Sequence, residues 1–100
     1  MWHSIGKKDK YSKGDKWLVK VNGRPVGLFR YNNNYYAIKN SCLHQGYPLH
    51  EGLLCDYMIE CKLHGWVFDI RDGKCLSLGN RSTKIYELRI IKDEIEIKID

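Results

Sequence analysis

The chain has 100 residues, of which 43% are hydrophobic, and a formal net charge of +5. This length suits one domain with one modest core. The longest apolar run, residues 35–38, is far shorter than the roughly 20 residues of a membrane span, and the polar, basic N-terminus has no secretory signal. We therefore expect a single domain, residues 1–100, in a soluble, cytoplasmic protein. Residues 1–14 are expected to be mobile.

Short strands separated by turn residues follow one another from residue 16 onward. KWLVKV (16–21) alternates apolar and polar residues and predicts the first strand, and PVGLFRY (25–31) and YYAIK (35–39) predict the next two. An Asn-Gly turn and a run of three asparagines separate them. We expect these segments to form neighbouring antiparallel strands.

The strand rhythm is interrupted between residues 42 and 64. A loop region this long in so small a domain is typical of a functional site. Beyond it, WVFDI (66–70) and KCLSL (74–78) flank Asp72-Gly73, which is a strong hairpin signal.

The C-terminal part predicts a second hairpin. KIYELRII (84–91) is expected to pair with EIEIKI (94–99), whose three isoleucines alternate with charged residues and so share one face. No segment shows sustained helical periodicity. The sequence therefore predicts an all-β fold, a small antiparallel sandwich or open barrel.

Cysteine and histidine are concentrated between residues 42 and 64. Two pairs of metal-ligand side chains stand there, sixteen residues apart: Cys42 with His44, and Cys61 with His64. Each pair is closely followed by a glycine, Gly46 or Gly65, which lets the backbone approach closely and present N–H groups to an anion such as sulfide. Four cysteines in a chain without an export signal favour metal or redox chemistry over a disulfide scaffold.

These residues resemble the signature of the Rieske [2Fe–2S] family, and in particular Rieske-type ferredoxins. CLHQGYPLHEG and IECKLHGWVFDIRDGKC match the pattern C-x-H…C-x-x-H, and the resemblance extends from about residue 16 to the C-terminus. It implies one [2Fe–2S] cluster in a cluster-binding subdomain of two loops, within about residues 40–70. It further implies that Cys42 and Cys61 ligate one iron and that His44 and His64 ligate the other. Gly46, Gly65 and Trp66 would lie next to the cluster.

Departures from the family pattern bear on the reduction potential. High-potential members have an extra cysteine in each loop, joined as a disulfide, where this chain has Tyr47 and Leu63. The same members have a serine and a tyrosine that donate hydrogen bonds to cluster sulfurs, where this chain has Trp66 and Phe68. Fewer donors stabilise the reduced state less. The resemblance therefore implies the low-potential subclass, with a potential independent of pH near neutrality.

A structural zinc site is the main alternative for the four ligands, because two cysteines and two histidines form a good zinc set. Zinc fingers usually group their cysteines and their histidines separately, however, rather than in two mixed pairs. We therefore favour the iron–sulfur cluster.

The remaining residues of these types receive simpler interpretations. Cys55 and Cys75 are expected to be buried free cysteines, with a disulfide between them as the alternative. His50 is expected on a surface loop, with a partner contact as the alternative. Trp66 and Phe68 should face one side, where they either shield the cluster or pack in the core.

We expect neither an oxygenase catalytic domain, for which the chain has no room, nor a membrane anchor, and therefore no enzyme activity of its own. The resemblance implies a one-electron carrier between a reductase and a terminal enzyme such as an oxygenase. We expect it to be a monomer when free and to dock on acidic patches of redox proteins, guided by Lys62, without binding nucleic acid or membranes. The alternative is a non-catalytic subunit or redox-sensing module, similar to the small subunit of some nitrite reductases.

Overall fold

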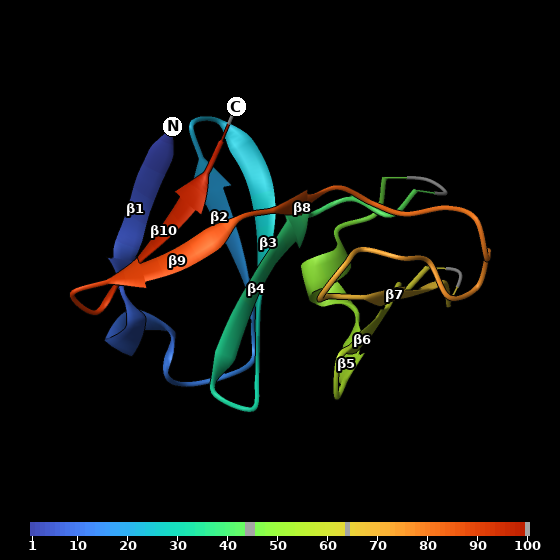
Figure 1. Ribbon diagram of the computed structural model, residues 1–100. Helices are drawn as coiled ribbons and strands as arrows, with labels where there is room; N and C mark the ends of the chain where they lie inside the picture. The colour runs from blue at the N-terminus through green and yellow to red at the C-terminus, as the bar shows by residue number, and fades with distance from the viewer. Residues whose placement is uncertain (44–45, 64, 100) are drawn as a thin grey trace.

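A computed structural model of the protein describes residues 1–43, 46–63 and 65–99. Its strands form three antiparallel sheets (Figure 1). The first sheet contains β1 (Trp2–Lys7), β10 (Glu94–Lys98) and β9 (Leu88–Ile91), in that order. The second contains β2 (Lys16–Val21), β3 (Arg24–Tyr31), β4 (Asn34–Lys39) and β8 (Ile85–Tyr86). The third contains β5 (Leu53–Cys55), β6 (Met58–Glu60) and β7 (Val67–Asp69). These sheets confirm the predicted all-β antiparallel fold.

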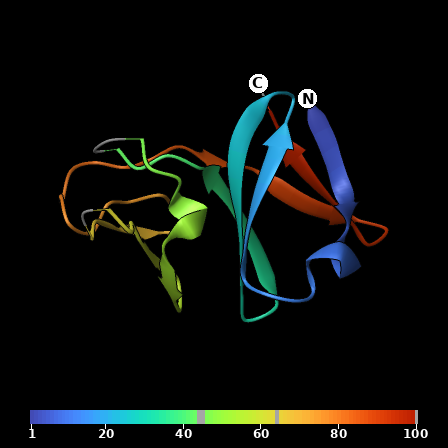
Figure 2. The ribbon, with the colours of Figure 1, turned by 180° about the vertical axis from the view of Figure 1, so that it is seen from behind.

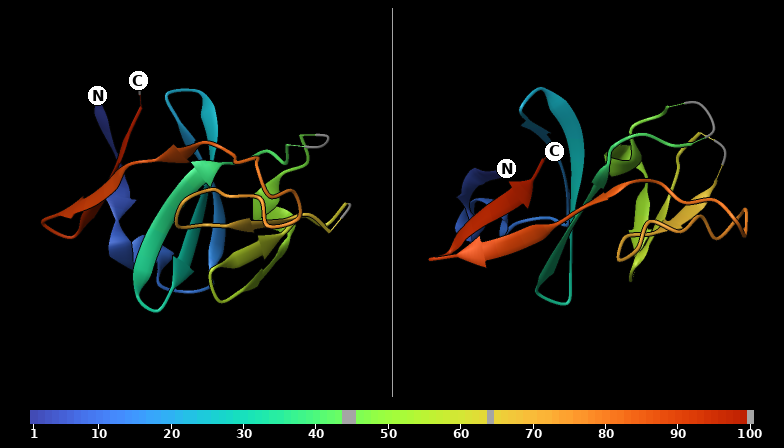
Figure 3. Two further views of the ribbon diagram at one scale, coloured as in Figure 1. Left: turned by 45° about the vertical axis from the view of Figure 1, so that its right-hand side comes forward. Right: turned by 45° about the horizontal axis from the view of Figure 1, so that its top comes forward.

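The second sheet is the middle layer of the molecule, and both of its faces are covered (Figures 2 and 3). On one face, Val26 and Ala37 pack against Ile97 of the first sheet. On the other, Phe29 and Ile38 pack against the third sheet and the loops around it. Because β3 is covered on both sides, residues 26–29 form an uninterrupted buried run rather than an alternating one.

Aromatic contacts fix the third sheet to the middle one. Tyr57, in the turn between β5 and β6, meets Tyr31 of β3 edge-on with ring centroids 4.7 Å apart. It meets Tyr36 of β4 in the same way at 5.9 Å. These T-shaped pairs hold the smaller part of the molecule at a defined distance from the larger one.

The three strands predicted in the first half are present as β2, β3 and β4, and their bounds differ from the prediction by at most one residue. Asn22, Asn32 and Asn33 all adopt positive φ, between 51° and 64°. Asparagine tolerates this conformation better than most residues, so the turn prediction was correct for a physical reason.

Two predicted strands in the second half were wrong. Residues 84–91 form two strands, because β8 pairs with β4 of the middle sheet whereas β9 pairs with β10 of the first. The chain changes sheets at Glu87, whose carbonyl accepts a hydrogen bond from the Lys98 N–H. Residues 74–78 form no strand; they contribute two isolated bridges, one between Phe68 and Cys75 and one between Lys74 and Ser82. The hydrophobic pattern indicated neither the change of sheet nor the missing strand.

The N-terminal segment has regular structure that the sequence did not indicate. β1 pairs with β10, and η1 (Lys8–Tyr11) follows it as a short 3-10 turn with Tyr11 buried. The expected mobility of residues 1–14 stays a prediction. In the described part of the chain, no helix is long and apolar enough to cross a membrane.

Candidate metal centre

The first candidate ligand loop, residues 42–47 (loop 1), is a tight turn closed by two backbone hydrogen bonds. The Gly46 N–H donates to the Cys42 carbonyl at 2.8 Å, and the Cys42 N–H donates to the Tyr47 carbonyl at 2.8 Å. Both the N–H and the carbonyl of Cys42 are therefore hydrogen-bonded within the turn, which fixes its backbone.

The second candidate ligand loop, residues 61–66 (loop 2), repeats this arrangement. The Gly65 N–H donates to the Cys61 carbonyl at 2.9 Å, and the Cys61 N–H donates to the Trp66 carbonyl at 2.6 Å. Although one cysteine–histidine pair is spaced C-x-H and the other C-x-x-H, the same turn holds both cysteines.

The glycine of each turn is required for its backbone conformation. Gly46 has φ 69° and Gly65 has φ 72°, in the left-handed region that glycine adopts without strain. Side-chain room is available at both, since a Cβ would meet no atom closer than 3.5 Å and 3.8 Å respectively. Their N–H groups close the turns. The presentation of other loop N–H groups to an anion stays a prediction.

The two turns bring both candidate cysteine ligands to one buried place. Cys42 is 3% exposed and Cys61 is 1% exposed, and both belong to one apolar cluster that also contains Ile59 and Phe68. Such an environment disfavours isolated charged thiolates but suits thiolates neutralised by a metal group. The cysteine half of the predicted donor set thus fits a metal or metal–sulfur group.

The two predicted histidine ligands, His44 and His64, lie outside the described residues. Within residues 1–43, 46–63 and 65–99, no three histidine, cysteine or carboxylate side chains gather as a complete metal site. Each missing histidine belongs to one of the two matched turns, so both turns remain candidates for one cysteine and one histidine ligand.

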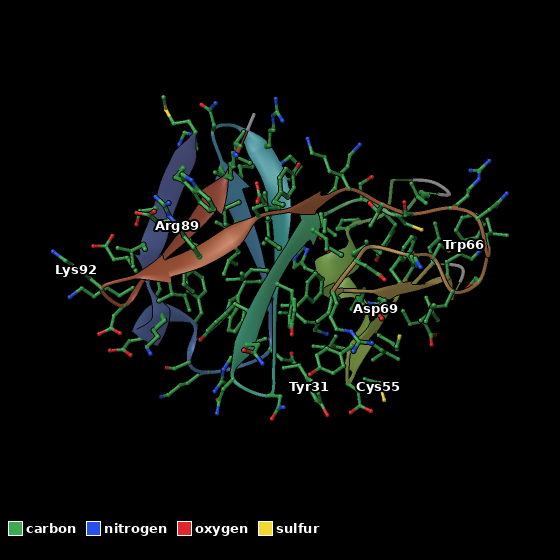
Figure 4. All side chains as sticks on the ribbon, in the orientation of Figure 1. Tyr31, Cys55, Trp66, Asp69, Arg89 and Lys92 are labelled. Atoms are coloured by element: carbon green, nitrogen blue, oxygen red, sulfur yellow. The ribbon has the colours of Figure 1, made fainter. Side chains whose placement is uncertain are left out.

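The two remaining cysteines differ from each other. Cys75 is buried, as expected, whereas Cys55 is exposed at the end of β5, at the tip of a hairpin. Figure 4 shows Cys55 beside Tyr31, well away from Trp66 of loop 2. Both thiols are free, so the alternative of a Cys55–Cys75 disulfide is wrong, and so is the expected burial of Cys55.

Trp66, just before β7, and Phe68, within it, pack against the same apolar cluster, as the alternation predicted. Phe68 is fully buried in the apolar cluster around the two cysteines, and Trp66 packs against that cluster while staying partly exposed. Val67, between them, donates its N–H to the Ser77 Oγ at 3.0 Å. Core packing is therefore confirmed, and a role in shielding the cluster stays a prediction.

A charged pair behind loop 2 was not found from the sequence. Asp69, at the end of β7, accepts hydrogen bonds from Arg71 Nε at 3.0 Å and from Arg71 Nη2 at 2.8 Å. These bonds lower the pKa of Asp69 below its ordinary value of 3.8, although partial burial opposes the shift. The guanidinium carbon of Arg71 also lies 4.1 Å from the Tyr57 ring centroid. The pair therefore stabilises the hairpin that carries loop 2.

His50 is not the plain surface residue that the sequence suggested. It is half-buried in η2 (Leu49–Glu51), and both its backbone and its ring are hydrogen-bonded to the side chain of Asn40. Asn40 was missed because nothing in the sequence marks a buried asparagine at the end of a strand.

Comparison with known proteins identifies the family of the chain. Residues 1–89 match the family model of the Rieske [2Fe-2S] domain. The chain belongs to this family. The Rieske assignment implies one [2Fe–2S] cluster as its cofactor.

Relatives that match over almost their whole length are ferredoxins. The chain is 28% identical over 100 residues to the anthranilate 1,2-dioxygenase ferredoxin subunit of Burkholderia cepacia, covering 98% of this chain and 92% of that protein. It is 31% identical over 100 residues to the ferredoxin component of the naphthalene 1,2-dioxygenase/salicylate 5-hydroxylase systems of a Ralstonia species, covering 99% and 96%.

Solved structures agree with this assignment. The ferredoxin of carbazole 1,9a-dioxygenase from Nocardioides aromaticivorans has a TM-score of 0.88 with 26% identity, covering 100% of this chain and 99% of that one. The same fold makes up part of a terminal oxygenase from a Novosphingobium species, with a TM-score of 0.88 and 24% identity, of which the chain covers 29%. This Rieske chain is therefore an electron-transfer protein and not a catalytic subunit.

Proposed function

We propose that this Rieske protein carries single electrons between a reductase and a terminal oxygenase. The observation that supports the proposal is the pair of matched turns, which bury Cys42 and Cys61 in one apolar cluster. Ferredoxin components of dioxygenase systems match the chain over nearly its full length.

In our proposal, Cys42 and Cys61 ligate one iron and His44 and His64 ligate the other, with Gly46, Gly65 and Trp66 beside the cluster. When bound, the cluster supplies a one-electron couple whose potential is raised by its two neutral imidazole ligands. The residues of this chain supply the rest: thiolate donors in fixed turns, and an apolar surround of Phe68 and its neighbours that excludes water.

The side chains around the turns support a low reduction potential. Phe68 is fully buried among apolar residues and carries no hydroxyl group. Tyr47 packs against the same apolar cluster, and Leu63 is 46% exposed, so a disulfide between the loops has no counterpart here. We expect a potential of roughly −150 mV, near the lower end of the Rieske range.

The surface around the turns suits a redox partner with an apolar centre and an acidic rim. Leu43 and Leu63 are exposed apolar residues, one beside each predicted histidine ligand, and Lys62 is exposed between Cys61 and His64. Arg24, Lys39 and Lys84 line one hollow with Tyr86, at the end of β4 from which loop 1 departs. We further propose that the carrier is a cytoplasmic monomer when free and that partners approach this face through charge attraction.

The test begins with iron and acid-labile sulfide analysis of the purified protein, followed by an EPR spectrum after reduction. Two irons and two sulfides with a Rieske-type spectrum are expected. Zinc in place of iron would refute the proposal, and a stable complex that never releases the chain would exclude a free carrier.

The histidine ligands are tested by His64→Cys. A thiolate in place of a neutral imidazole should lower the potential well below that of the wild type. An unchanged potential in an intact cluster would show that His64 is not a ligand.

A further inference from the structure

The side chain of Asn40 joins the two ends of loop 1. Asn40 immediately follows β4 and precedes the loop, and His50 lies in η2, just after it. Asn40 Oδ1 accepts a hydrogen bond from the His50 backbone N–H at 2.8 Å, and Asn40 Nδ2 lies 2.8 Å from the His50 Nδ1. We call this pair of contacts the loop-1 clamp.

The chemistry of the clamp fixes which atom donates. A backbone N–H can only donate, so the Asn40 atom facing it must be the oxygen, and the atom facing the His50 ring must be the NH₂ group. The His50 Nδ1 must therefore accept through its lone pair. In this state the imidazole is neutral and carries its proton on Nε2.

The surroundings hold Asn40 in place. Asn40 is 5% exposed, and its N–H donates to the Pro25 carbonyl at 3.3 Å. A Cβ at position 27 would lie 3.0 Å from Asn40 Oδ1, so Gly27 leaves the space that the amide occupies. With Leu49 fully buried beside His50, neither end of the clamp can shift far to compensate for a lost bond.

We propose that Asn40 and His50 are positioning residues for Cys42, and that protonation of His50 releases the ring half of the clamp. An imidazolium has no lone pair at Nδ1 and would set N–H against N–H. The amide cannot rotate to repair this contact, because its oxygen is held by the His50 N–H. The inference rests on the proposed function in one respect: Cys42 must be a cluster ligand.

Histidine is the side chain that ordinarily changes charge between pH 5 and 8. The strands packed most closely against η2 are β2, β3 and β6, and none of them contains a histidine. Apart from His50, the charged or titratable residues on these strands, on η2 and next to Asn40 are Lys16, Lys20, Arg24, Arg30, Tyr31, Lys39, Glu51 and Glu60. Lys16 Nζ donates to the Gly52 carbonyl, next to η2. The acid response of the clamp is therefore assigned to His50.

The experiment compares the rate of cluster loss between pH 5.5 and 7.5 in the wild type, His50→Asn and Asn40→Asp, followed by bleaching of the cluster absorbance. His50→Asn offers a non-titrating oxygen in place of Nδ1, so its clamp should persist in acid. In Asn40→Asp the carboxylate accepts from a protonated ring, so acid should strengthen the clamp instead of breaking it.

We expect acid to accelerate cluster loss in the wild type about three- to tenfold more than in His50→Asn, the effect of one hydrogen bond. Asn40→Asp should show a smaller acceleration than His50→Asn, or a reversal. Three parallel pH profiles would overturn the inference, even if Asn40→Asp folds poorly, since His50→Asn alone must flatten the profile. Absence of iron and sulfide from the wild type would instead refute the proposed function.

Discussion

Loop 1 and loop 2 contain the same turn but are supported in different ways. Loop 2 joins two neighbouring strands, and Glu60 of β6 pairs directly with Val67 of β7 at its base. Loop 1 leaves the middle sheet at the end of β4 and reaches η2, with no strand pair beneath it. Its base is closed by the Asn40 side chain instead. The two ligand turns are thus alike, although backbone strand pairing supports loop 2 and side-chain hydrogen bonds support loop 1.

The largest expected effect tests whether each loop supplies a cysteine ligand that the cluster needs. Cys42→Ser and Cys61→Ser should each abolish assembly of the cluster, because a serine hydroxyl does not replace a thiolate that binds iron. Iron and sulfide content of the purified variants measures this. Cys55→Ser is the matched control, since Cys55 is exposed at a distant hairpin tip and should leave the content unchanged. Full cluster content in either ligand variant would contradict the assignment.

The next largest effect tests whether both turns depend on the positive φ of their glycine. Gly46→Ala and Gly65→Ala place an L-residue at positive φ and should each cost about 1–2 kcal/mol of stability. Denaturant unfolding of the cluster-loaded protein measures the loss. Gly79→Ala is the control, because Gly79 has no positive φ and a methyl group there would meet no atom within 4 Å. Equal losses at all three positions would show that backbone conformation is not the cause.

The charged pair behind loop 2 should give a smaller, pH-dependent effect. Asp69→Asn removes the acceptor of the two Arg71 bonds and should cost about 1–2 kcal/mol at neutral pH. Because folding lowers the pKa of Asp69, its stabilisation is present above the ordinary value of 3.8 and is lost as the pH falls through the lowered value. In unfolding curves from pH 7 to pH 3, the stability difference between the two proteins should therefore begin to shrink as the pH falls below 3.8. Asp93→Asn, at an exposed turn, is the control and should change the stability far less. Curves that stay parallel down to pH 3 would contradict the role of the pair.

The smallest effect concerns docking. Lys62→Ala in loop 2 should slow electron transfer from an acidic reductase about two- to fivefold at low salt, and the difference should vanish at high salt. Lys92→Ala is the control, since Figure 4 places Lys92 at the opposite end of the molecule from Trp66 of loop 2. Stopped-flow kinetics at several salt concentrations measures both. A salt-independent effect at Lys62, or an equal effect at Lys92, would contradict steering by this face.

Local signals explain the part of the fold that could be predicted. Asparagine and glycine at positive φ set the turns between β2, β3 and β4, and alternation set the last strand, where Ile95, Ile97 and Ile99 are all buried. The split of residues 84–91 between two sheets could not be predicted, because β8 and β9 differ only in which distant strand they pair with. The first strand was missed for the same reason, since its partner is β10 at the other end of the chain.

The sequence by itself determined the candidate ligands, their division into two loops and the family, because cysteine and histidine spacing is local and specific. Only the tertiary structure decided how each loop is supported. Asn40 and His50 meet because η2 folds back onto the end of β4, and Arg71 meets Tyr57 because a hairpin returns the chain. Contacts of this kind depend on distances between segments, which the residue pattern of neither segment encodes.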